Sequence, residues 1–337
     1  MTPAPGPIGT RPRWRRTTCA WLAAALSFWP AVWPDPARAA TAEAAQVVEC
    51  PPEPDTTAAA RATPRDRGFL WRLTRDGRVS WLYGTLHVGR AEWAAPGPRL
   101  REALRSVDAV ALELDPLDPQ VAGDFARALD ALPPADSTLD AGHRQRLERL
   151  AERACTTLQP DTHPLVQLMQ LTLAEARRER LDPRYAQEIV LSMAARALQR
   201  PVHSLETAAQ QVSALLPPRT EQWHGEVDRA LKQLEEGRSQ PVLRRLAEVW
   251  ERGDYEALQD YPRWCECLLD DADRASFARL NDARNDVLAE RIAALHDGRR
   301  LQVFAAVGAL HMTGPRALPK LLAERHGYTV ERVVLTR

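Results

Sequence analysis

The chain has 337 residues, and its 45 basic residues are balanced by 45 acidic residues, so the formal net charge is zero. This balance gives no electrostatic reason to expect nucleic acid or an anionic membrane surface as a partner. The length suffices for one large domain or two small ones with a sizeable hydrophobic core.

Residues 1–39 have the pattern of a secretory signal peptide. Four arginines precede a short apolar segment, and Ala37-Arg38-Ala39 offers a cleavage site flanked by small residues. Pro30 interrupts the apolar segment, which is also short for a membrane span, although a retained anchor is the alternative. We therefore expect a periplasmic or secreted protein with no stable membrane span after the leader is removed.

Four cysteines remain beyond this leader: Cys50, Cys155, Cys265 and Cys267. An even number in an oxidising compartment indicates two disulfides. Because one residue separates Cys265 from Cys267, we expect each of them to pair with Cys50 or Cys155. A soft-metal site is the alternative, but Cys-Glu-Cys lacks the C-x2-C spacing that is typical of zinc sites.

Residues 40–67 show little periodicity and predict a flexible N-terminal arm. Beyond the arm, Arg75-Asp76-Gly77 predicts the turn of a β-hairpin, because glycine accepts a positive φ. The predicted strands Phe69–Leu73 and Val79–Tyr83 form this hairpin. A helix at Pro98–Ser106 and a strand at Ala109–Leu114 are expected to follow it.

The middle of the chain has helical periodicity, interrupted by a short predicted strand at Pro201–Glu206 whose next residue, Thr207, can cap a helix. The expected helices include His163–Leu181, Pro183–Arg200 and one long helix at Asp273–Gly298. The last expected elements are a strand at Leu301–Val307, a helix at Pro315–His326 and a strand at Tyr328–Leu335. Strands at both ends of a helical segment predict one α/β domain over residues 68–337, with a helical insert at about 119–296. Its central mixed sheet is built from two strand–GxxH–helix–strand units.

The two GxxH motifs place His87 and His311 three residues after Gly84 and Gly308. A strand that runs into a loop delivers side chains to the carboxyl edge of a sheet, where α/β proteins bind ligands. Glycine at this point permits a sharp turn or a close approach by another segment. We expect the two imidazoles to share one site, suited to a divalent metal or to general-base chemistry. The alternative is that each histidine only ends a strand.

Glu113 and Glu206 also end predicted strands. Burying an unpaired carboxylate is costly, so each is expected to meet a metal or an arginine, or to lie at a solvated edge. Two histidines with one or two carboxylates form a sensible donor set for a divalent metal. The other histidines lack a strand-end context and are expected to be structural or exposed.

Five segments in order carry a resemblance to a known family: WLYGTLHVG, ALELDP, PVHSLETAAQQ, LNDARNDVLAERI and VFAAVGALHMTG. Together they resemble the TraB/PrgY/GumN family, which is related to the Tiki metalloproteases, over most of the chain after Phe69. The resemblance implies metal ligands at His87, Glu113, Glu206 and His311, and an Arg-Asn pair at Arg284 and Asn285. Arg284 would clamp a substrate carboxylate or orient a glutamate; a solvated helix residue is the alternative.

These observations predict an exported metal-dependent hydrolase, most simply a peptidase, acting on a peptide or small-molecule substrate. A divalent ion (Mn²⁺, Co²⁺ or Zn²⁺) at the histidines would activate water, and a remaining carboxylate, Glu113 or Glu206, would carry the proton. Arg284 and Asn285 complete the expected catalytic set. Two alternatives stay open: a non-catalytic periplasmic protein that binds a peptide signal or haem, and an esterase-like hydrolase that uses a histidine base without metal.

Overall fold

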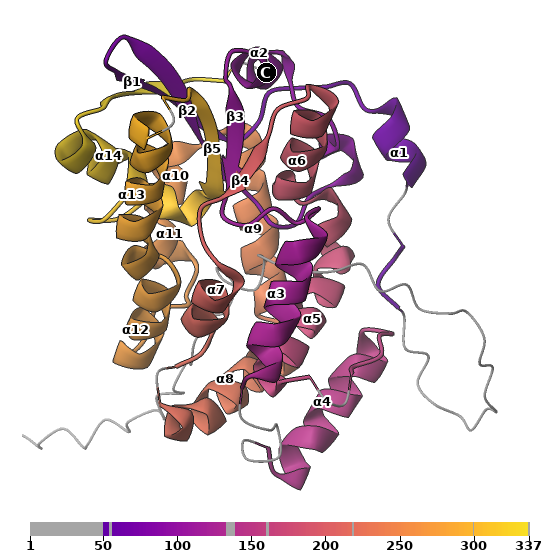
Figure 1. The fold of residues 1–337 in the computed structure, drawn as a ribbon. Helices are drawn as coiled ribbons and strands as arrows, with labels where there is room; N and C mark the ends of the chain where they lie inside the picture. Colours follow the sequence, from indigo (N-terminus) through magenta and orange to yellow (C-terminus); the bar gives the residue numbers. More distant parts are fainter. Residues whose placement is uncertain are drawn as a thin grey trace, which may run out of the picture.

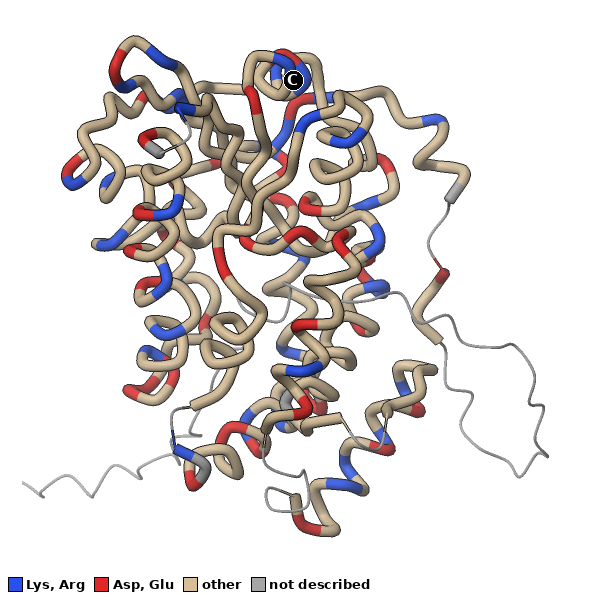
Figure 2. The backbone as a smooth tube through the Cα atoms, in the orientation of Figure 1, with Lys and Arg blue, Asp and Glu red and all other residues tan. Residues whose placement is uncertain are grey.

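The computed structural model describes residues 50–53, 56–132, 139–159, 162–217, 219–298 and 300–335. The predicted signal peptide and most of residues 40–55 lie outside these ranges. Figure 1 shows a sheet in the upper part of the molecule and a group of helices below it. Figure 2 shows acidic and basic residues interspersed along the helices, in keeping with the zero net charge. None of the described helices is long and apolar enough to cross a membrane.

The predicted hairpin at the start of the domain is confirmed. It consists of β1 (Phe69–Arg75) and β2 (Arg78–Thr85), which pair antiparallel. The turn residues Asp76 and Gly77 have φ values of 52° and 73°. Positive φ at both central positions matches the right-handed twist of the flanking strands, which is why an Asp-Gly pair suits this turn.

The sheet has six strands in the order β4-β3-β5-β2-β1-β6, so the predicted mixed sheet is confirmed. β5 lies between β2 and β3 and is parallel to both, and β4 is parallel to β3. The carboxyl ends of these four strands therefore meet at one edge. β1 is antiparallel to both of its neighbours. The remaining strands are β3 (Ala109–Leu112), β4 (Val202–Ser204), β5 (Val303–Gly308) and β6 (Thr329–Val333).

Every residue of β3 and β5 is buried. Their sequences, AVAL and VFAAVG, lack polar side chains, as expected for strands whose two faces are both covered. The hydrophobic core is centred on these strands and extends into the helices. The strands that lead to the carboxyl edge of the sheet are thus held in place by the hydrophobic core.

Between β3 and β5 the chain is mainly helical, as predicted, with β4 as the interruption (Figure 1). The Thr207 side chain caps the helix after β4 in a capping box with Gln210, also as predicted. The helices of this part are α3 (Pro119–Asp130), α4 (Ala141–Arg153), α5 (Pro164–Ala176), α6 (Gln187–Ala197), α7 (Ala208–Leu215), α8 (Trp223–Glu235), α9 (Ser239–Arg252), α10 (Tyr255–Gln259), α11 (Tyr261–Trp264), α12 (Asp271–Leu280) and α13 (Asp282–Gly298). Outside it lie α1 (Thr56–Arg61), α2 (Pro98–Arg105), α14 (Leu318–His326) and the short 3₁₀ helix η7 (Ala309–Met312).

The single long helix predicted at Asp273–Gly298 is wrong, because the chain breaks into α12 and α13 at Asn281. Asn281 is buried with φ −120° and ψ −73°, and its amide donates to the Phe277 carbonyl. An asparagine side chain that competes for backbone groups in this way disfavours a continuous helix. The break places Arg284 in the first turn of α13, facing the edge of the sheet.

Two disulfides are present, but the predicted pairing is wrong. Cys50 bonds to Cys155 with a Cα separation of 5.5 Å, and Cys265 bonds to Cys267 at 5.0 Å. Glu266, between the last two, has φ +49°, and this left-handed residue brings its neighbours within disulfide reach. The two disulfides are compatible with an oxidising environment.

The end of the predicted flexible arm is held in place by a buried acid. The Asp66 carboxylate accepts hydrogen bonds from the backbone N–H groups of Arg99 and Leu100, both at 3.1 Å. These N–H groups belong to the first turn of α2. The N-cap residue of this helix is Gly97, which has no side chain that could cap it. Asp66 therefore supplies the missing cap and attaches the arm to the domain.

Candidate active site at the carboxyl edge of the sheet

The structure brings the four residues predicted as metal ligands to one edge of the sheet. His87 follows β2, His311 lies in η7 directly after β5, and Glu113 and Glu206 follow β3 and β4. The pairing of β3 with β4 continues beyond the strands, since Glu206 N–H donates to the Glu113 carbonyl at 3.0 Å. Parallel strands thus account for the convergence of side chains that are distant in sequence.

Both imidazoles face one oxygen of Glu113. The Nε2 atoms of His87 and His311 lie 3.9 Å and 4.0 Å from Glu113 Oε1. The exposed fractions of these residues are 6%, 3% and 2% for His87, His311 and Glu113. The three groups therefore form one buried polar cluster.

Gly308 leaves the space in the middle of this cluster. Its N–H donates to Glu113 Oε1 at 2.7 Å. A Cβ atom at Gly308 would lie 3.2 Å from His87 Nε2 and 3.3 Å from Glu113 Oε1, tighter than ordinary contact. Gly84 has a different neighbour, because its Cβ would lie 3.2 Å from the Cα of Ala309. In both motifs the glycine permits a close approach rather than a left-handed turn.

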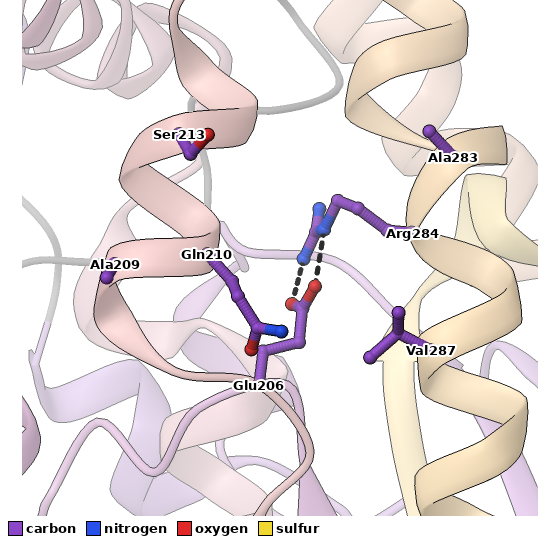
Figure 3. A pocket seen from close by; sticks show the side chains of 7 residues that line it. All are labelled: Glu206, Ala209, Gln210, Ser213, Ala283, Arg284 and Val287. Atoms are coloured by element: carbon purple, nitrogen blue, oxygen red, sulfur yellow. Dashed lines mark hydrogen bonds and ion pairs between the residues drawn. The ribbon is translucent and has the colours of Figure 1, made fainter.

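Arg284 joins the two carboxylates. Its Nε donates to Glu206 Oε1 at 2.9 Å, and its Nη2 contacts both Glu206 Oε2 and Glu113 Oε2. Figure 3 shows the paired contacts between Arg284 and Glu206. The Gln211 amide also donates to both acids, at 3.3 Å to Glu113 and 3.1 Å to Glu206. One guanidinium and one amide therefore satisfy two adjacent buried carboxylates.

The ion pairs decide the protonation of this group. Burial alone would raise the pKa of Glu113, but Arg284, the two imidazoles and the Gly308 N–H together lower it below its ordinary value. Burial alone would lower the pKa of Arg284, but the two carboxylates raise it above its ordinary value. Glu113 is therefore ionised and Arg284 remains a cation at neutral pH.

Asn285 fixes the tautomer of His311. Its Nδ2 donates to the carbonyls of His311 at 3.2 Å and of Arg316 at 2.8 Å, so its Oδ1 has to accept. That oxygen lies 2.5 Å from His311 Nδ1, which consequently carries the hydrogen. Burial and the Arg284 charge lower the pKa of His311 to about 3. His311 is thus neutral and turns an Nε2 lone pair towards Glu113.

Glu188 faces Nδ1 of His87, as Asn285 faces Nδ1 of His311. Its Oε1 lies 2.8 Å from His87 Nδ1, without an aligned hydrogen bond, and accepts from the Thr85 hydroxyl. Burial lowers the pKa of His87, but Glu188 and then Glu113 outweigh burial, so the pKa is raised. The two histidines of the site therefore have opposite pKa shifts.

Glu188, Thr85 and Gln211 contact the site and were not predicted from the sequence. Glu188 and Gln211 are buried polar residues on faces of α6 and α7 that also bury apolar side chains. A long polar side chain at a core-facing helix position was the available signal, because it needs a buried partner. Tyr83, which precedes Gly84 on β2, does not contact the site and is a core residue whose hydroxyl donates to the Arg67 carbonyl at 2.8 Å.

An open cleft of about 360 Å³ between α7 and α13 reaches the outer side of this cluster (Figure 3). Glu206 and Arg284 lie at the cleft, and the histidines are not among its lining residues. The other lining side chains are mostly small: Ala209, Gln210, Ser213, Ala283 and Val287. A substrate in this cleft would meet the Arg284–Glu206 pair first.

The donor chemistry of the cluster fits a divalent metal, but its spacing is wider than a bound ion requires. Two imidazoles oriented from behind by Glu188 and Asn285, together with a carboxylate oxygen, resemble a metal site with supporting hydrogen-bond partners. With bonds of about 2.1 Å, ligand atoms lie within about 4.2 Å of one another. The pairs His87–Glu113 and His311–Glu113 meet this limit, but the three donor atoms do not all lie within 4.8 Å of one another. A shift of the two imidazole rings towards each other would bring all three donor atoms within the distance that a bound ion requires.

The fold and the site define an α/β protein with a buried His-Glu-Arg cluster at the carboxyl edge of a mixed sheet. The chain belongs to the TraB/PrgY/gumN family, whose sequence model matches residues 69–332, from the start of β1 almost to the end of β6. It is similar to the uncharacterized protein YbaP of Shigella flexneri, with 25% identity over 278 residues, covering 77% of this chain and 96% of YbaP. No solved structure matches. The family predicted from the five segments is therefore confirmed.

Proposed function

We propose that the chain is an exported hydrolase, acting on peptide or related acyl bonds, whose reaction takes place between His87, His311 and Glu113. The observation that supports this most directly is the aim of both Nε2 atoms at a single carboxylate oxygen. His311 Nε2, the Glu113 carboxylate and, in the neutral form of His87, its Nε2 atom are all acceptors. Such an arrangement favours a cation or a polarised water between them.

The residues that would hold a divalent ion are His87, His311 and Glu113, oriented by Glu188 and Asn285. An ion of the Mn²⁺, Co²⁺ or Zn²⁺ type would supply a water of lowered pKa and polarise the scissile carbonyl. Asn285 contacts His311 and not the cleft, so we assign it a positioning role.

Arg284 and Glu206 line the cleft and are placed to meet the substrate. The guanidinium would stabilise negative charge that develops on the substrate, and Glu206 would carry the proton to the leaving group. For both groups to act in this way, a bound substrate has to loosen the Arg284–Glu206 pair. Export is supported by the signal-peptide pattern and by the two disulfides.

A metal-independent hydrolase is the second candidate, and the contact between His87 and Glu188 favours it. A histidine whose Nδ1 faces a carboxylate has the arrangement of a general base oriented by an acid. Arg284 already neutralises much of the negative charge that would otherwise attract an ion. In this candidate, His87 Nε2 takes the proton of the attacking water.

The test is metal analysis of protein purified without a metal-affinity tag, combined with cleavage of a peptide library. The proposal expects bound metal and turnover, with both lost in His311→Ala and both kept in the matched control His326→Ala on α14. Turnover that survives chelation would support the metal-independent candidate. A tightly retained ligand without turnover of any library member would contradict hydrolysis and favour a binding protein.

A further inference from the structure

A second cluster of ligating side chains lies where α4 packs against α8, and it shares no residue with the candidate active site. Asp140, His143 and His224 each offer a ligand atom, and these atoms all lie within 4.8 Å of one another. Asp228 adds a further carboxylate, since its Oδ1 lies 3.9 Å from His143 Nε2. The two helices pack together in the part of the molecule below the sheet (Figure 1).

The local structure explains why these side chains meet. Asp140 is the N-cap of α4, and its Oδ1 accepts from the backbone N–H of His143 at 2.8 Å. This capping interaction fixes the first turn of α4, and α4 packs against α8. On α8, His224 and Asp228 are four residues apart and therefore lie on one face of the helix.

The histidines are oriented as metal ligands are. Asp140 Oδ1 also lies 2.8 Å from His143 Nδ1, which holds the imidazole and leaves Nε2 for a ligand. Asp140 Oδ2 lies 3.9 Å from His224 Nε2. The two rings meet edge to face with their centroids 4.4 Å apart. Ligand atoms at these separations can surround one ion with bonds of about 2.0–2.2 Å after small side-chain rotations.

Burial and charge also favour an ion here. His143 is 7% exposed, whereas Asp140, His224 and Asp228 are exposed, so an ion can enter from solvent and reach a fixed nitrogen. Asp140 and Asp228 supply carboxylate oxygens, which attract a cation. Arg146 Nη1 donates to Asp228 Oδ1 at 2.5 Å, the same oxygen that faces His143, so Asp228 has to release Arg146 before this oxygen can bind an ion.

We propose that Asp140, His143, His224 and Asp228 form a second divalent-metal site that joins α4 to α8. Two imidazole nitrogens with carboxylate oxygens suit Zn²⁺ and similar borderline ions. The site would act structurally. Cys155, two residues beyond the end of α4, is tied to Cys50, so an ion at the N-terminus would fix this helix at both ends.

The experiment is calorimetric titration of the full mature chain with Zn²⁺, together with thermal unfolding in the presence and absence of the ion. The measurement uses the His87→Ala/His311→Ala background, so that the candidate active site does not contribute. We expect one equivalent of Zn²⁺ to bind and to raise Tm. His224→Ala, at an exposed position, should weaken binding at least tenfold and abolish the Tm shift, and the control His326→Ala should change neither.

If the His87→Ala/His311→Ala chain does not fold, the same comparison is made in the wild-type chain. There, His224→Ala should reduce the total amount of bound Zn²⁺ by one equivalent. Binding that is equally tight with and without His224 would overturn the proposal. So would the absence of binding in the wild-type chain. Weak binding that His326→Ala and His224→Ala reduce alike would mean an adventitious ion only, and would also overturn it.

Discussion

The two halves of the candidate active site share a motif and differ in the residue behind each ring. His87 after β2 has the Glu188 carboxylate at its Nδ1, whereas His311 after β5 has the Asn285 amide. The pKa of the first is raised, and that of the second is lowered to about 3. The strand and its glycine place the ring, but the helix that supports the ring decides its charge.

Because of this difference, the two imidazoles differ in their ability to take up a proton. His311 keeps an available Nε2 lone pair at any physiological pH, because burial disfavours its protonated form and the nearby charge of Arg284 adds to this effect. His87 can gain a proton, because Glu188 and Glu113 stabilise its charged form. Within one pair of identical motifs, one histidine is suited to constant ligation and the other to proton transfer.

The largest effect is expected when Arg284, the cation between Glu113 and Glu206, is replaced. Arg284→Met leaves Glu113 and Glu206 buried without their charged partner. Loss of one member of a buried ion pair typically costs about 3–5 kcal/mol. Urea unfolding should show a loss of this size, with Arg284→Lys intermediate because it keeps the charge but not the paired geometry. Wild-type stability for Arg284→Met would mean that the carboxylates are solvated or protonated.

The two glycines should respond differently to alanine. In Gly84→Ala the new Cβ meets the backbone of Ala309 at 3.2 Å, which cannot yield without moving η7. We expect about 1–3 kcal/mol of destabilisation in denaturant unfolding, the usual cost of overpacking. Gly308→Ala meets side-chain atoms, so its main effect should be the loss of metal or substrate binding. Equal stability losses with binding retained in Gly308→Ala would contradict the role of Gly308 as the open centre of the site.

A histidine outside the candidate active site tests the effect of burial on the pKa of an imidazole. Burial lowers the pKa of His163, which packs edge to face on Trp223, from 6.5 to about 4. The neutral form is favoured in the fold, so its contribution is present above pH 6.5 and is lost as pH falls towards 4. His163→Gln should reduce this acid-induced loss of unfolding free energy by about 1–2 kcal/mol. An unchanged pH dependence between 6.5 and 4 would contradict the assignment.

The smallest effect on stability is expected from Glu188→Gln. This substitution places an amide at Nδ1 of His87, as Asn285 does at Nδ1 of His311. Because the pKa of His87 is raised in the fold, its contribution is present below pH 6.5 and is lost as pH rises through the folded pKa. The substitution should therefore destabilise by about 1 kcal/mol below pH 6.5 and by less above it.

Imidazole NMR of chelator-treated protein would follow the titration of His87 directly, with Glu290→Gln on the exposed face of α13 as the matched control. We expect the pKa of His87 to fall in Glu188→Gln and to stay unchanged in the control. A His87 pKa that does not respond to Glu188→Gln would remove the distinction between the two halves.

What the sequence could predict follows from the regularity of strands. His87, Glu113, Glu206 and His311 each follow a strand, and parallel strands bring such positions together whatever the intervening chain does. The sequence could not place Glu188 or Gln211, because a residue on a helix finds its partner only when the face that packs on the sheet is known.

Two wrong predictions have the same local origin. The break between α12 and α13 depends on the side-chain bond of Asn281, and the Cys265–Cys267 disulfide depends on a left-handed Glu266. Helical periodicity and cysteine spacing describe the average backbone, and neither reports the conformation of one residue. Departures confined to a single residue are therefore the ones that pattern analysis misses.

The position of β5 has a consequence for the order in which the protein is completed. β5 separates β2 from β3, yet it begins at Val303, close to the end of the chain. Until this segment emerges during synthesis, β2 and β3 have no strand between them, and His87 and Glu113 lack the Gly308 N–H and the second imidazole. A chain cut short before Val303 would therefore carry three of the four converging side chains and no assembled site. Only a polypeptide that extends beyond His311 can therefore possess the complete buried cluster.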